Sequence, residues 1–531
     1  MKATPKIPHV PEEERTPLVA MLLEIIRIQQ EQIQELRDEI ARLKGQKPKP
    51  QIKPSVLEKD SSKEETKTPG WKRPGSAKRD KTKLLEIHNT VIIPVPDVPA
   101  GSKHNGFEDF TVQGLLFQLN NTLYRRERWL TPQGRCMVAP LPEHLKALGS
   151  HFDVPLRSFV LSQYYQCHVT QPLIHQQLRD LGVDISVGQV NRIIIEDKDR
   201  FHTEKGEILR TGLAISTYIN VDDTGARHRG KNGYCTAIGN KLFAWFESRH
   251  RKSRMNFLEL LRAGTTDYVL TCDALAYMEM QKLPQTHIEQ LEGLEKRVFE
   301  DERAWKAALE SVGLTNERHV RIVTEAGLLG SIIEHGITHP DLAIISDDAG
   351  QFNVLLHGLC WIHAERPIRK LTGHTAAQRD SLEQTRERIW ALYRDLKDYK
   401  QTPIPEKKPE LENRFDEIFT SRTSYETLNQ ALTRIHKNKS ELLLVLERPD
   451  IPLHNNDSET DIREYVKKRK ISGSTRSDLG RLCRDTFTTL KKTCRKLGVS
   501  FWEYLNDRIS GTNSIPWLPN LMRQQMGEAP G

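Results

Sequence analysis

Three acidic residues stand where their side chains could hold metal ions for phosphoryl-transfer chemistry. Asp222 closes a β-rich run, Asp347 closes the apolar run that begins at position 342, and Glu459 follows the predicted helix cap Asn455. A carboxylate at the end of an apolar strand costs desolvation free energy unless a cation is bound, so two such endings predict a cation site at one edge of a sheet. Two divalent cations ~3.5–4 Å apart at such an edge lower the pKa of an attacking water or 3′-hydroxyl and stabilise the leaving oxygen of a phosphodiester.

Other interpretations of these acidic residues stay open. Either aspartate taken alone is equally well explained as a turn cap, because Asp often occupies the turn that follows a strand. Asp273 competes with Asp347 for the second position, since the stretch between 222 and 347 is long enough to hold inserted helices. A phosphatase of the haloacid dehalogenase type is disfavoured, because its chemistry requires Asp-x-Asp and the first two aspartates here, at 222 and 223, are adjacent.

Basic residues surround the third acidic position. Arg463 lies four residues after Glu459 and therefore on the same helix face, where it can steady the carboxylate or reach a phosphate. Further cations continue this helix and the next one. Such runs are usually solvated faces, but beside an acidic site they favour contact with a DNA backbone, which weakens steeply with salt. The predicted DNA-contacting cations of this region are Lys467, Lys468, Arg469, Lys470, Lys491 and Lys492.

A second candidate DNA-contacting unit lies upstream. The segment 173–181 is periodic, Gly182 supplies a turn, and Ser186 caps a second helix that runs to position 195. Helix, short turn and helix is the outline of a helix-turn-helix, although helical hairpins that bind nothing share it. In the DNA-reading interpretation the second helix presents Gln189, Asn191 and Arg192.

The acidic residues need a sheet to position them, and the sequence predicts one. From position 213, three β-rich runs separated by turns are followed by a helix, a further strand at 268–271 and, after a helical stretch, the run before Asp347. Three meandering strands followed by helices and more strands fit an α/β fold, in which helices cover a mixed sheet. The charged stretch 372–450 is predicted to be a helical insertion into this domain.

The N-terminal part of the chain predicts an oligomer. In residues 17–44, Ile and Leu alternate in steps of four and three, the a/d pattern of a parallel dimeric coiled coil, with Gln29 as a polar exception. An amphipathic helix packed on its own chain is the alternative. We therefore expect a homodimer or a higher oligomer. The predicted parts are a disordered N-terminus (1–16), the coiled coil (17–44), a basic Pro/Lys-rich linker (45–87), a small mixed domain (88–150), a mainly helical region with the helix-turn-helix (151–212), the catalytic domain (213–510) with its insertion (372–450), and a C-terminal tail (511–531).

Four ordered motifs carry a resemblance to a known family. The segments 222–227 (DDTGAR), 346–352 (SDDAGQF), 360–366 (CWIHAER) and 455–463 (NNDSETDIR) resemble the successive motifs of the insertion-sequence-sixty-six family of DDE transposases. The likeness covers roughly residues 110–510, and four motifs in order are far more specific than any one of them. It implies a ribonuclease H-like catalytic domain, and it carries the catalytic and metal-binding triad onto Asp222, Asp347 and Glu459.

The resemblance also implies cofactors, partners and supporting residues. These are two Mg²⁺ or Mn²⁺ ions, double-stranded DNA at transposon ends and target, and the neighbouring positions Asp223 and Asp348. His363, one helical turn after Cys360, resembles a position in related groups, where it would touch the scissile phosphate or the metal. Two departures stand out. The family's first motif usually has Glu where this chain has Asp223, and residues 45–135 contain no cysteine, so the zinc module of many members is not expected.

Bulk properties narrow the class of protein further. No apolar run reaches the ~20 residues of a membrane span, and the polar, Pro-rich start has no secretory core. Seven cysteines without a CxxC pair argue against a disulfide framework and a four-Cys zinc site. We therefore predict a cytoplasmic, nucleoid-associated transposase that cuts transposon ends and joins them to target DNA by a metal-dependent DDE mechanism. The alternative is a catalytically inactive, dimeric DNA-binding regulator derived from a transposase.

Overall fold

The computed structural model describes residues 87–94, 96–97, 99–108, 110–113, 117–142 and 151–527, and six single positions near the N-terminus. The predicted disordered N-terminus, the linker and most of the predicted coiled coil lie outside the described residues. Of the heptad positions, Leu22, Ile26 and Gln29 are helical and exposed, so the coiled coil stays a prediction. The chain divides into two compact units, Met1–Phe117 and Gln118–Gly531, and every element named below belongs to the second.

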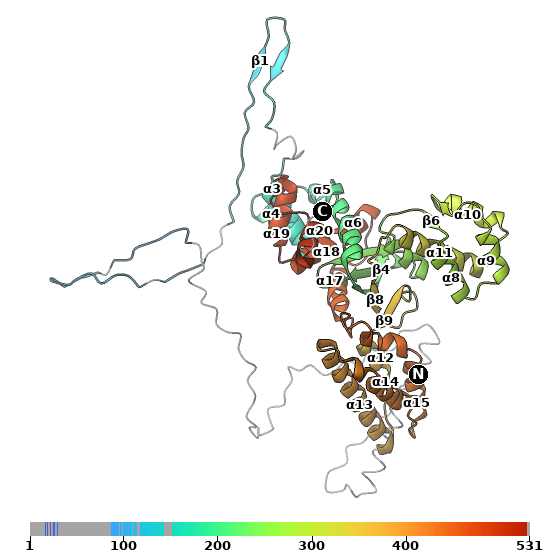
Figure 1. Ribbon diagram of the computed structural model, residues 1–531. Helices are drawn as coiled ribbons and strands as arrows, with labels where there is room; N and C mark the ends of the chain where they lie inside the picture. The colour runs from blue at the N-terminus through green and yellow to red at the C-terminus, as the bar shows by residue number, and fades with distance from the viewer. Residues whose placement is uncertain are drawn as a thin grey trace. The chain divides into compact units, whose positions relative to one another are not determined.

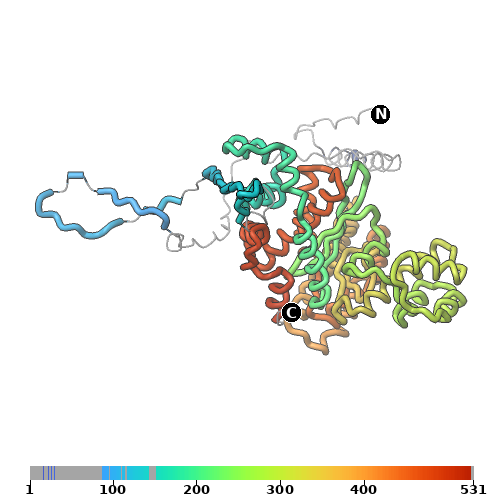
Figure 2. The backbone as a smooth tube through the Cα atoms, turned by 90° about the horizontal axis from the view of Figure 1, so that it is seen from above, coloured from blue at the N-terminus to red at the C-terminus, as the bar shows by residue number. Residues whose placement is uncertain are grey.

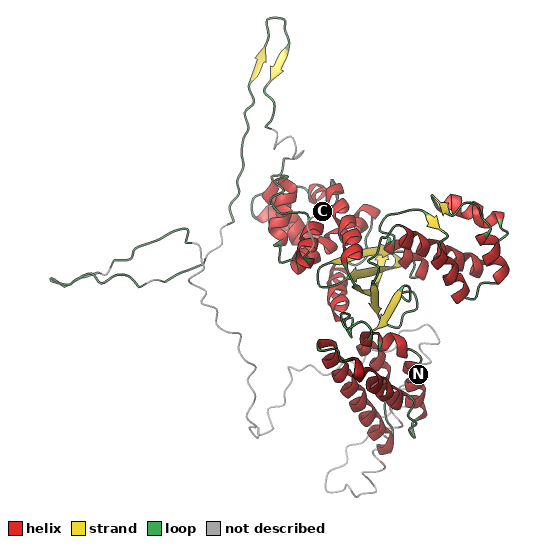
Figure 3. Ribbon diagram, viewed as in Figure 1, coloured by secondary structure: helices red, strands yellow, loops and turns green. Residues whose placement is uncertain are grey.

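A mixed five-stranded sheet lies at the centre of the second unit (Figure 1, Figure 3). Its strand order is β5-β4-β3-β8-β9. The first three strands form an antiparallel meander, and β8 and β9 continue the sheet in parallel with β3. The predicted α/β fold with a mixed sheet covered by helices is therefore confirmed. The strands are β3 (Tyr218–His228), β4 (Lys231–Gly239), β5 (Ala244–Arg249), β8 (Ala343–Ser346) and β9 (Leu356–Leu359).

The alternation of side chains along β3 explains how it positions polar residues beside a core. Ile219 and Val221 are fully buried and join the main core, which helices α6, α7, α11 and α18 help to build. Successive residues of a strand point to opposite faces of the sheet, so the side chains of Asn220 and Asp222 point to the face opposite this core. The covering helices are α6 (Asp199–Ile215), α7 (Arg254–Leu261), α11 (Glu317–Glu334), α17 (Asn456–Ser472) and α18 (Asp478–Lys496).

Two helical groups interrupt or follow the strands. The first, between β5 and β8, lies to one side of the sheet in both Figure 1 and Figure 2, where it is yellow-green. The second follows β9 and builds its own core around Trp361, Phe415 and Phe419. The first group contains α8 (Cys272–Met280), α9 (Gln285–Glu292), α10 (Glu302–Ser311), β6 (Tyr268–Val269) and β7 (Val298–Phe299). The second contains α12 (Trp361–Arg369), α13 (Ala376–Gln401), α14 (Lys408–Phe419), α15 (Glu426–His436) and α16 (Lys439–Leu442).

The remaining elements belong neither to the central sheet nor to the two helical groups. Residues 87–142 hold a short antiparallel strand pair, and a bundle of helices precedes β3 and closes the chain. Among the described residues, none of the helices has the length and apolar character that a membrane span requires. These elements are β1 (Arg128–Leu130), β2 (Cys136–Val138), α3 (Val154–Leu161), η3 (Ser162–Gln166), α4 (Gln171–Asp180), α5 (Val187–Ile195), α19 (Phe501–Ser510) and α20 (Leu518–Met526).

Two strand predictions need correction. The predicted strand at 268–271 is only Tyr268–Val269, and it pairs with β7 in a separate two-stranded sheet rather than joining the central one. The strand that was expected to end at Asp222 is β3, which begins at Tyr218 and continues to His228. It starts later than expected because α6 extends to Ile215. Asp222 therefore does not close a strand. Its strand goes on because β4 pairs with β3 along the whole of that extension.

A buried carboxylate, Asp485, ties α18 to β5. It accepts hydrogen bonds from the backbone N–H of Ser248 (2.8 Å) and from the Ser248 hydroxyl (2.9 Å). Burial raises the pKa of Asp485 to about 7, with Glu247 adding to the rise and Lys205 opposing it. The folded protein therefore binds a proton here over a pH range in which the unfolded chain has released it.

We expect the stability of the wild type to fall relative to that of an Asp485→Asn variant as the pH rises from 5 to 8. The raised pKa contributes stability that is fully present below the unfolded-state value of 3.8 and is lost as the pH rises through about 7. Asparagine does not titrate, so the difference in unfolding free energy should change by up to ~1.4 kcal/mol per pH unit. Chemical unfolding of both proteins across this range measures it, and a pH-independent difference would contradict the raised pKa.

Candidate active site at the β3–β8 edge

Asp222 and Asp347 occupy matching positions along two neighbouring parallel segments of the sheet. The last pair between β3 and β8 is Asn220 with Ile345, and two further residues along each chain lead to Asp222 and Asp347. The ladder with β8 stops there, whereas β4 stays paired with β3 as far as His228. One side of β3 is therefore unpaired beside Asp222, at the level where Asp347 follows β8.

Burial raises the pKa of Asp222 to about 6. A hydrogen bond from the backbone N–H of Asp223 to Asp222 Oδ1 (2.8 Å) opposes this rise, and the negative charges of Asp347, Asp223 and Glu459 add to it. The predicted triad therefore lies within electrostatic reach of Asp222. A partly dehydrated carboxyl among like charges is the situation that a bound cation relieves.

Glu459 lies in the first turn of α17, which packs on β3 and β4. Its carboxylate meets three nitrogen-bearing side chains: His363 (Nε2 to Oε1, 3.3 Å), Arg366 (Nη2 to Oε1, 3.2 Å) and Arg463 (Nη2 to Oε2, 3.3 Å). Arg463 comes from the same helix, as its four-residue spacing predicted, and the other two come from α12. The carboxylate of Glu459 is thus held by nitrogen atoms of side chains from α12 and α17.

His363 faces the acidic cluster from α12. Burial lowers the pKa of its imidazole, as does Arg366, while Glu459 and Asp347 oppose that change. Its buried Nδ1 has no hydrogen-bond partner among the described residues. His363 therefore offers a ring beside Glu459 with one nitrogen that no described side chain or backbone group occupies.

The aspartates next to the triad have partners of their own. Asp223 accepts hydrogen bonds from the Thr236 hydroxyl (2.6 Å) and from Gln351 Nε2 (2.9 Å). Asp348 pairs with Arg434 (3.2 Å) in the second helical group. Asp223 and Asp348 therefore connect the β3–β8 edge to neighbouring elements of the fold.

Asp273, the rival for the second acidic position, lies elsewhere. It is exposed in the first turn of α8, within the first helical group. The register of β3 with β8 brings Asp347 to the level of Asp222, and the charge of Asp347 adds to the rise of the pKa of Asp222. The geometry therefore favours Asp347.

Asn455 connects α17 with β3 and with the start of α12. The sequence predicted it only as a helix cap. It stands at the N-cap position of α17, but its side chain makes no cap bond. Instead its Nδ2 donates to the backbone oxygen of Val221 (2.7 Å), the residue before Asp222, and its backbone N–H donates to Cys360 Sγ (3.2 Å). Burial raises the pKa of the Cys360 thiol. Cys360 thus serves as a neutral acceptor at the start of α12.

Arg366 is the residue at this site that the sequence did not single out. Its hydrogen bond with Glu459 spans 93 residues of chain, which no local pattern reports. The one signal that could have found it was its three-residue spacing from His363, which places both side chains on neighbouring turns of one helix face.

The candidate metal ligands are oxygen donors that are not gathered into a preformed cage. Within the described ranges, no three His, Cys, Asp or Glu side chains lie close enough together to hold a metal ion. Carboxylate oxygens are nevertheless the ligands that Mg²⁺ and Mn²⁺ prefer, and the dehydrated, like-charged surroundings of Asp222 suit a cation. In this structure Glu459 Oε1 contacts His363 and Arg366, and its Oε2 contacts Arg463.

Three of the predicted DNA-contacting cations are buried, which corrects their assignment. Lys468 donates to the backbone oxygen of Tyr164 (2.7 Å), and the other two, Lys491 and Lys492, are held by acidic residues of α17 at 2.9 Å each. Consecutive residues of a helix face different directions, so a run of cations cannot all share one outer face. The exposed members are Lys467 and Lys470, while Arg469 donates to the Thr224 hydroxyl (3.1 Å) and to the backbone oxygen of Gly225.

The upstream helix pair has the outline that the sequence predicted. α4 and α5 pack on each other, and Ser186 caps α5 through a capping box with Gln189. Because Gln189 Oε1 accepts the Ser186 N–H (2.8 Å), that side chain is engaged within the helix start. Asn191 is half-buried and Arg192 is exposed. Their contact with DNA stays a prediction.

Comparison with known proteins gives two matches. Residues 344–481 match a family described as the Transposase IS66 family, and this span contains Asp347, His363 and Glu459. The chain is also 45% identical, over 304 residues, to the uncharacterized protein y4jO of Sinorhizobium fredii. That alignment covers 57% of this chain and 94% of the relative.

Proposed function

Because the chain belongs to the IS66 transposase family, we propose that it is a DDE transposase that hydrolyses a phosphodiester at each transposon end and joins the freed 3′-hydroxyl to target DNA. The observation that carries this proposal is that Asp222 and Asp347 each lie two residues beyond the last β3–β8 pair, with the charge of Glu459 adding to the raised pKa of Asp222. A meander of three antiparallel strands continued by two parallel strands supports a ribonuclease H-like catalytic domain.

Asp222, Asp347 and Glu459 would hold two Mg²⁺ or Mn²⁺ ions. When bound, such ions lower the pKa of the attacking oxygen and stabilise the charge on the leaving one. Among the chain's own groups, Asp222 and Asp347 supply negative charge from the sheet edge, and Arg463 keeps Glu459 oriented from within α17. Arg366, whose Nη2 lies 3.2 Å from Glu459 Oε1, would contact a phosphate oxygen from α12.

The DNA partner is proposed to meet exposed cations on several elements. Arg192, with Asn191 beside it on α5, and Lys470 on α17 would make phosphate or base contacts, together with Lys467, which is exposed although it lies 3.6 Å from Glu464. The heptad pattern of residues 17–44 supports a dimer or a higher oligomer, which would bring two ends together. Lys468, Lys491 and Lys492 are left out, because their ammonium groups have partners inside the protein.

The test is a cleavage and strand-transfer assay with the full chain and DNA that carries the ends of its own element. We expect nicked ends and joined products in Mg²⁺ or Mn²⁺, and neither product when EDTA removes the ions. Products that persist in EDTA would contradict the metal mechanism. End-specific binding without any product in Mn²⁺ would instead support the inactive, dimeric regulator.

A further inference from the structure

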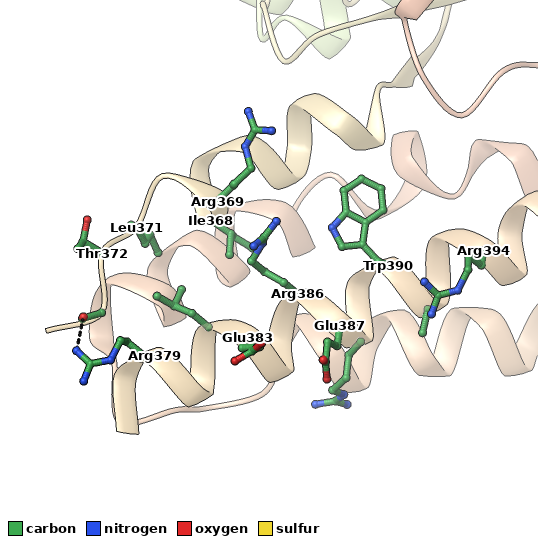
Figure 4. Close-up of a pocket in the computed structure, with 14 residues that line it drawn as sticks. Ile368, Arg369, Leu371, Thr372, Arg379, Glu383, Arg386, Glu387, Trp390 and Arg394 are labelled. Atoms are coloured by element: carbon green, nitrogen blue, oxygen red, sulfur yellow. Dashed lines mark hydrogen bonds between the residues drawn. The ribbon is translucent and has the colours of Figure 1, made fainter. Parts of the chain in front are cut away.

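A groove of about 1070 Å³ runs along α13 beside the end of α12 (Figure 4). Five arginines and two glutamates line it, together with one tryptophan, Trp390. In the close-up, Arg369, Arg386 and Trp390 extend to the same side. The five arginines are Arg369, Arg379, Arg386, Arg388 and Arg394.

The five arginines outnumber the two glutamates of the lining, and three of these arginines have no ion-pair partner among the described residues. Arg386 Nε donates to the buried carboxylate of Glu365 (2.6 Å), which fixes α13 to α12. Arg369, Arg388 and Arg394 are exposed, and none of them forms an ion pair with a residue that the structure describes. Guanidinium groups that are held on rigid helices without protein partners are suited to the oxygens of phosphate groups.

Trp390 is not a core residue of its helix group. Trp361 is fully buried in that core, whereas Trp390 is half-buried, lines the groove and packs edge-on against Tyr393 (5.2 Å between ring centroids). A tryptophan among unpaired arginines can stack on a nucleobase while the arginines hold the adjoining backbone. In a paired duplex the faces of the bases are covered by their neighbours, so such stacking requires an unpaired nucleotide.

One helix connects the groove with the acidic edge. Arg366 of α12 contacts Glu459, and Arg369, three residues later, lines the groove. Three residues of a helix advance ~4.5 Å along the axis, which is slightly more than one nucleotide at ~3.4 Å per step of one strand. A DNA strand that contacts Arg366 would therefore reach the groove within one or two nucleotides.

We propose that this groove binds the DNA strand next to the scissile phosphodiester, and that Trp390 stacks on an unpaired base there. The inference rests on the proposed transposase function, because it takes DNA at the acidic edge as its starting point. It assigns the second helical group a substrate-binding role: the arginines hold phosphates, and Trp390 selects DNA whose flank is unpaired. The occupant is a DNA strand with at least one unstacked nucleotide.

The test compares binding of two oligonucleotides by fluorescence anisotropy in EDTA, so that no cleavage occurs. Both carry the element's terminal sequence, one fully paired and one with a short unpaired flank at the cleavage end. Trp390→Ala should weaken binding of the flanked DNA by about 5- to 150-fold, the effect of removing one stacking partner, and leave the paired DNA unchanged. Trp390→Phe should restore most of the affinity, because its ring still stacks.

The matched control is Trp502→Ala, which removes a tryptophan that is 41% exposed on α19 and should alter neither affinity. An Arg369→Gln/Arg394→Gln double variant should weaken binding of both DNAs and reduce the salt slope by about 0.9 for each phosphate that is no longer neutralised. Equal effects of Trp390→Ala on both DNAs, or no effect on either, would overturn the proposal. Failure of the transposase function is distinguishable: the binding difference would persist in EDTA while Mn²⁺ gave no product.

Discussion

An Asp222→Asn variant is expected to lose cleavage and strand transfer by ~10³-fold or more while it still folds and binds end DNA. Ion-assisted stabilisation of charge in the transition state amounts to several kcal/mol, and each ~1.36 kcal/mol is a factor of ten in rate. Asparagine keeps the shape of the side chain but removes the negative charge that the proposed ions require. Gel-based quantification of nicked and joined products in Mn²⁺ measures the loss.

The stability of this variant separates a catalytic role from a structural one. Burial raises the pKa of Asp222 to about 6, and its like-charged neighbours add to the rise, so its charge does not favour folding. Asparagine Oδ1 can still accept the Asp223 N–H. We therefore expect the metal-free variant to unfold at the same temperature as the wild type or at a higher one. The increase in unfolding temperature that Mn²⁺ gives the wild type should be absent, because ligand-linked stabilisation requires binding.

Asp273→Asn is the matched control, since it removes an exposed aspartate on α8 that was the rival for the second acidic position. It should retain full activity, whereas Asp347→Asn should behave like Asp222→Asn. An active Asp222→Asn protein would refute the proposed site. An active Asp347→Asn protein together with an inactive Asp273→Asn protein would move the second ligand to α8.

The sequence predicted those parts of the candidate site that local patterns encode. Asp347 follows an apolar run and Glu459 follows a helix start, so strand and helix signals were enough to mark them. The position of Asp222 within its strand was predicted wrongly, because the extension of β3 depends on its pairing with β4 and not on the residues around Asp222 alone. The residue pattern of one strand does not determine where the pairing with its neighbouring strand ends.

The cations that were predicted to contact DNA show a second limit of sequence patterns. Lys468, Lys491 and Lys492 belong to helices whose basic runs look like solvated faces, yet other elements cover them. Lys468 lies against Tyr164, some 304 residues earlier in the chain. Burial of a lysine depends on which distant element packs over it, and composition along one helix carries no information on that.

Arg508→Met is expected to cause a large loss of stability, of about 3–5 kcal/mol in the free energy of unfolding, because it leaves a buried charge unpaired. The side chains of Arg508 and Glu204 are both 0% exposed, and the guanidinium meets both carboxylate oxygens at 3.0 Å. Glu204 also accepts the Tyr504 hydroxyl (2.7 Å) and the Leu518 N–H (2.9 Å). The pair thus joins α6 to α19 and to the start of α20.

Two further variants decide whether the unpaired charge is the cause. Glu204→Gln combined with Arg508→Met should recover part of the loss, since the fully buried Glu204 charge is then removed and only Asp507, which also contacts Arg508, loses a charged partner. Lys296→Met, which breaks the exposed pair of Lys296 with Glu300, should leave the unfolding midpoint unchanged, because surface ion pairs contribute little. Urea unfolding followed by circular dichroism compares all the variants with the wild type. If Arg508→Met shifts the midpoint no more than Lys296→Met does, or if the double variant is the least stable of all, the buried pair does not hold these helices together as the geometry predicts.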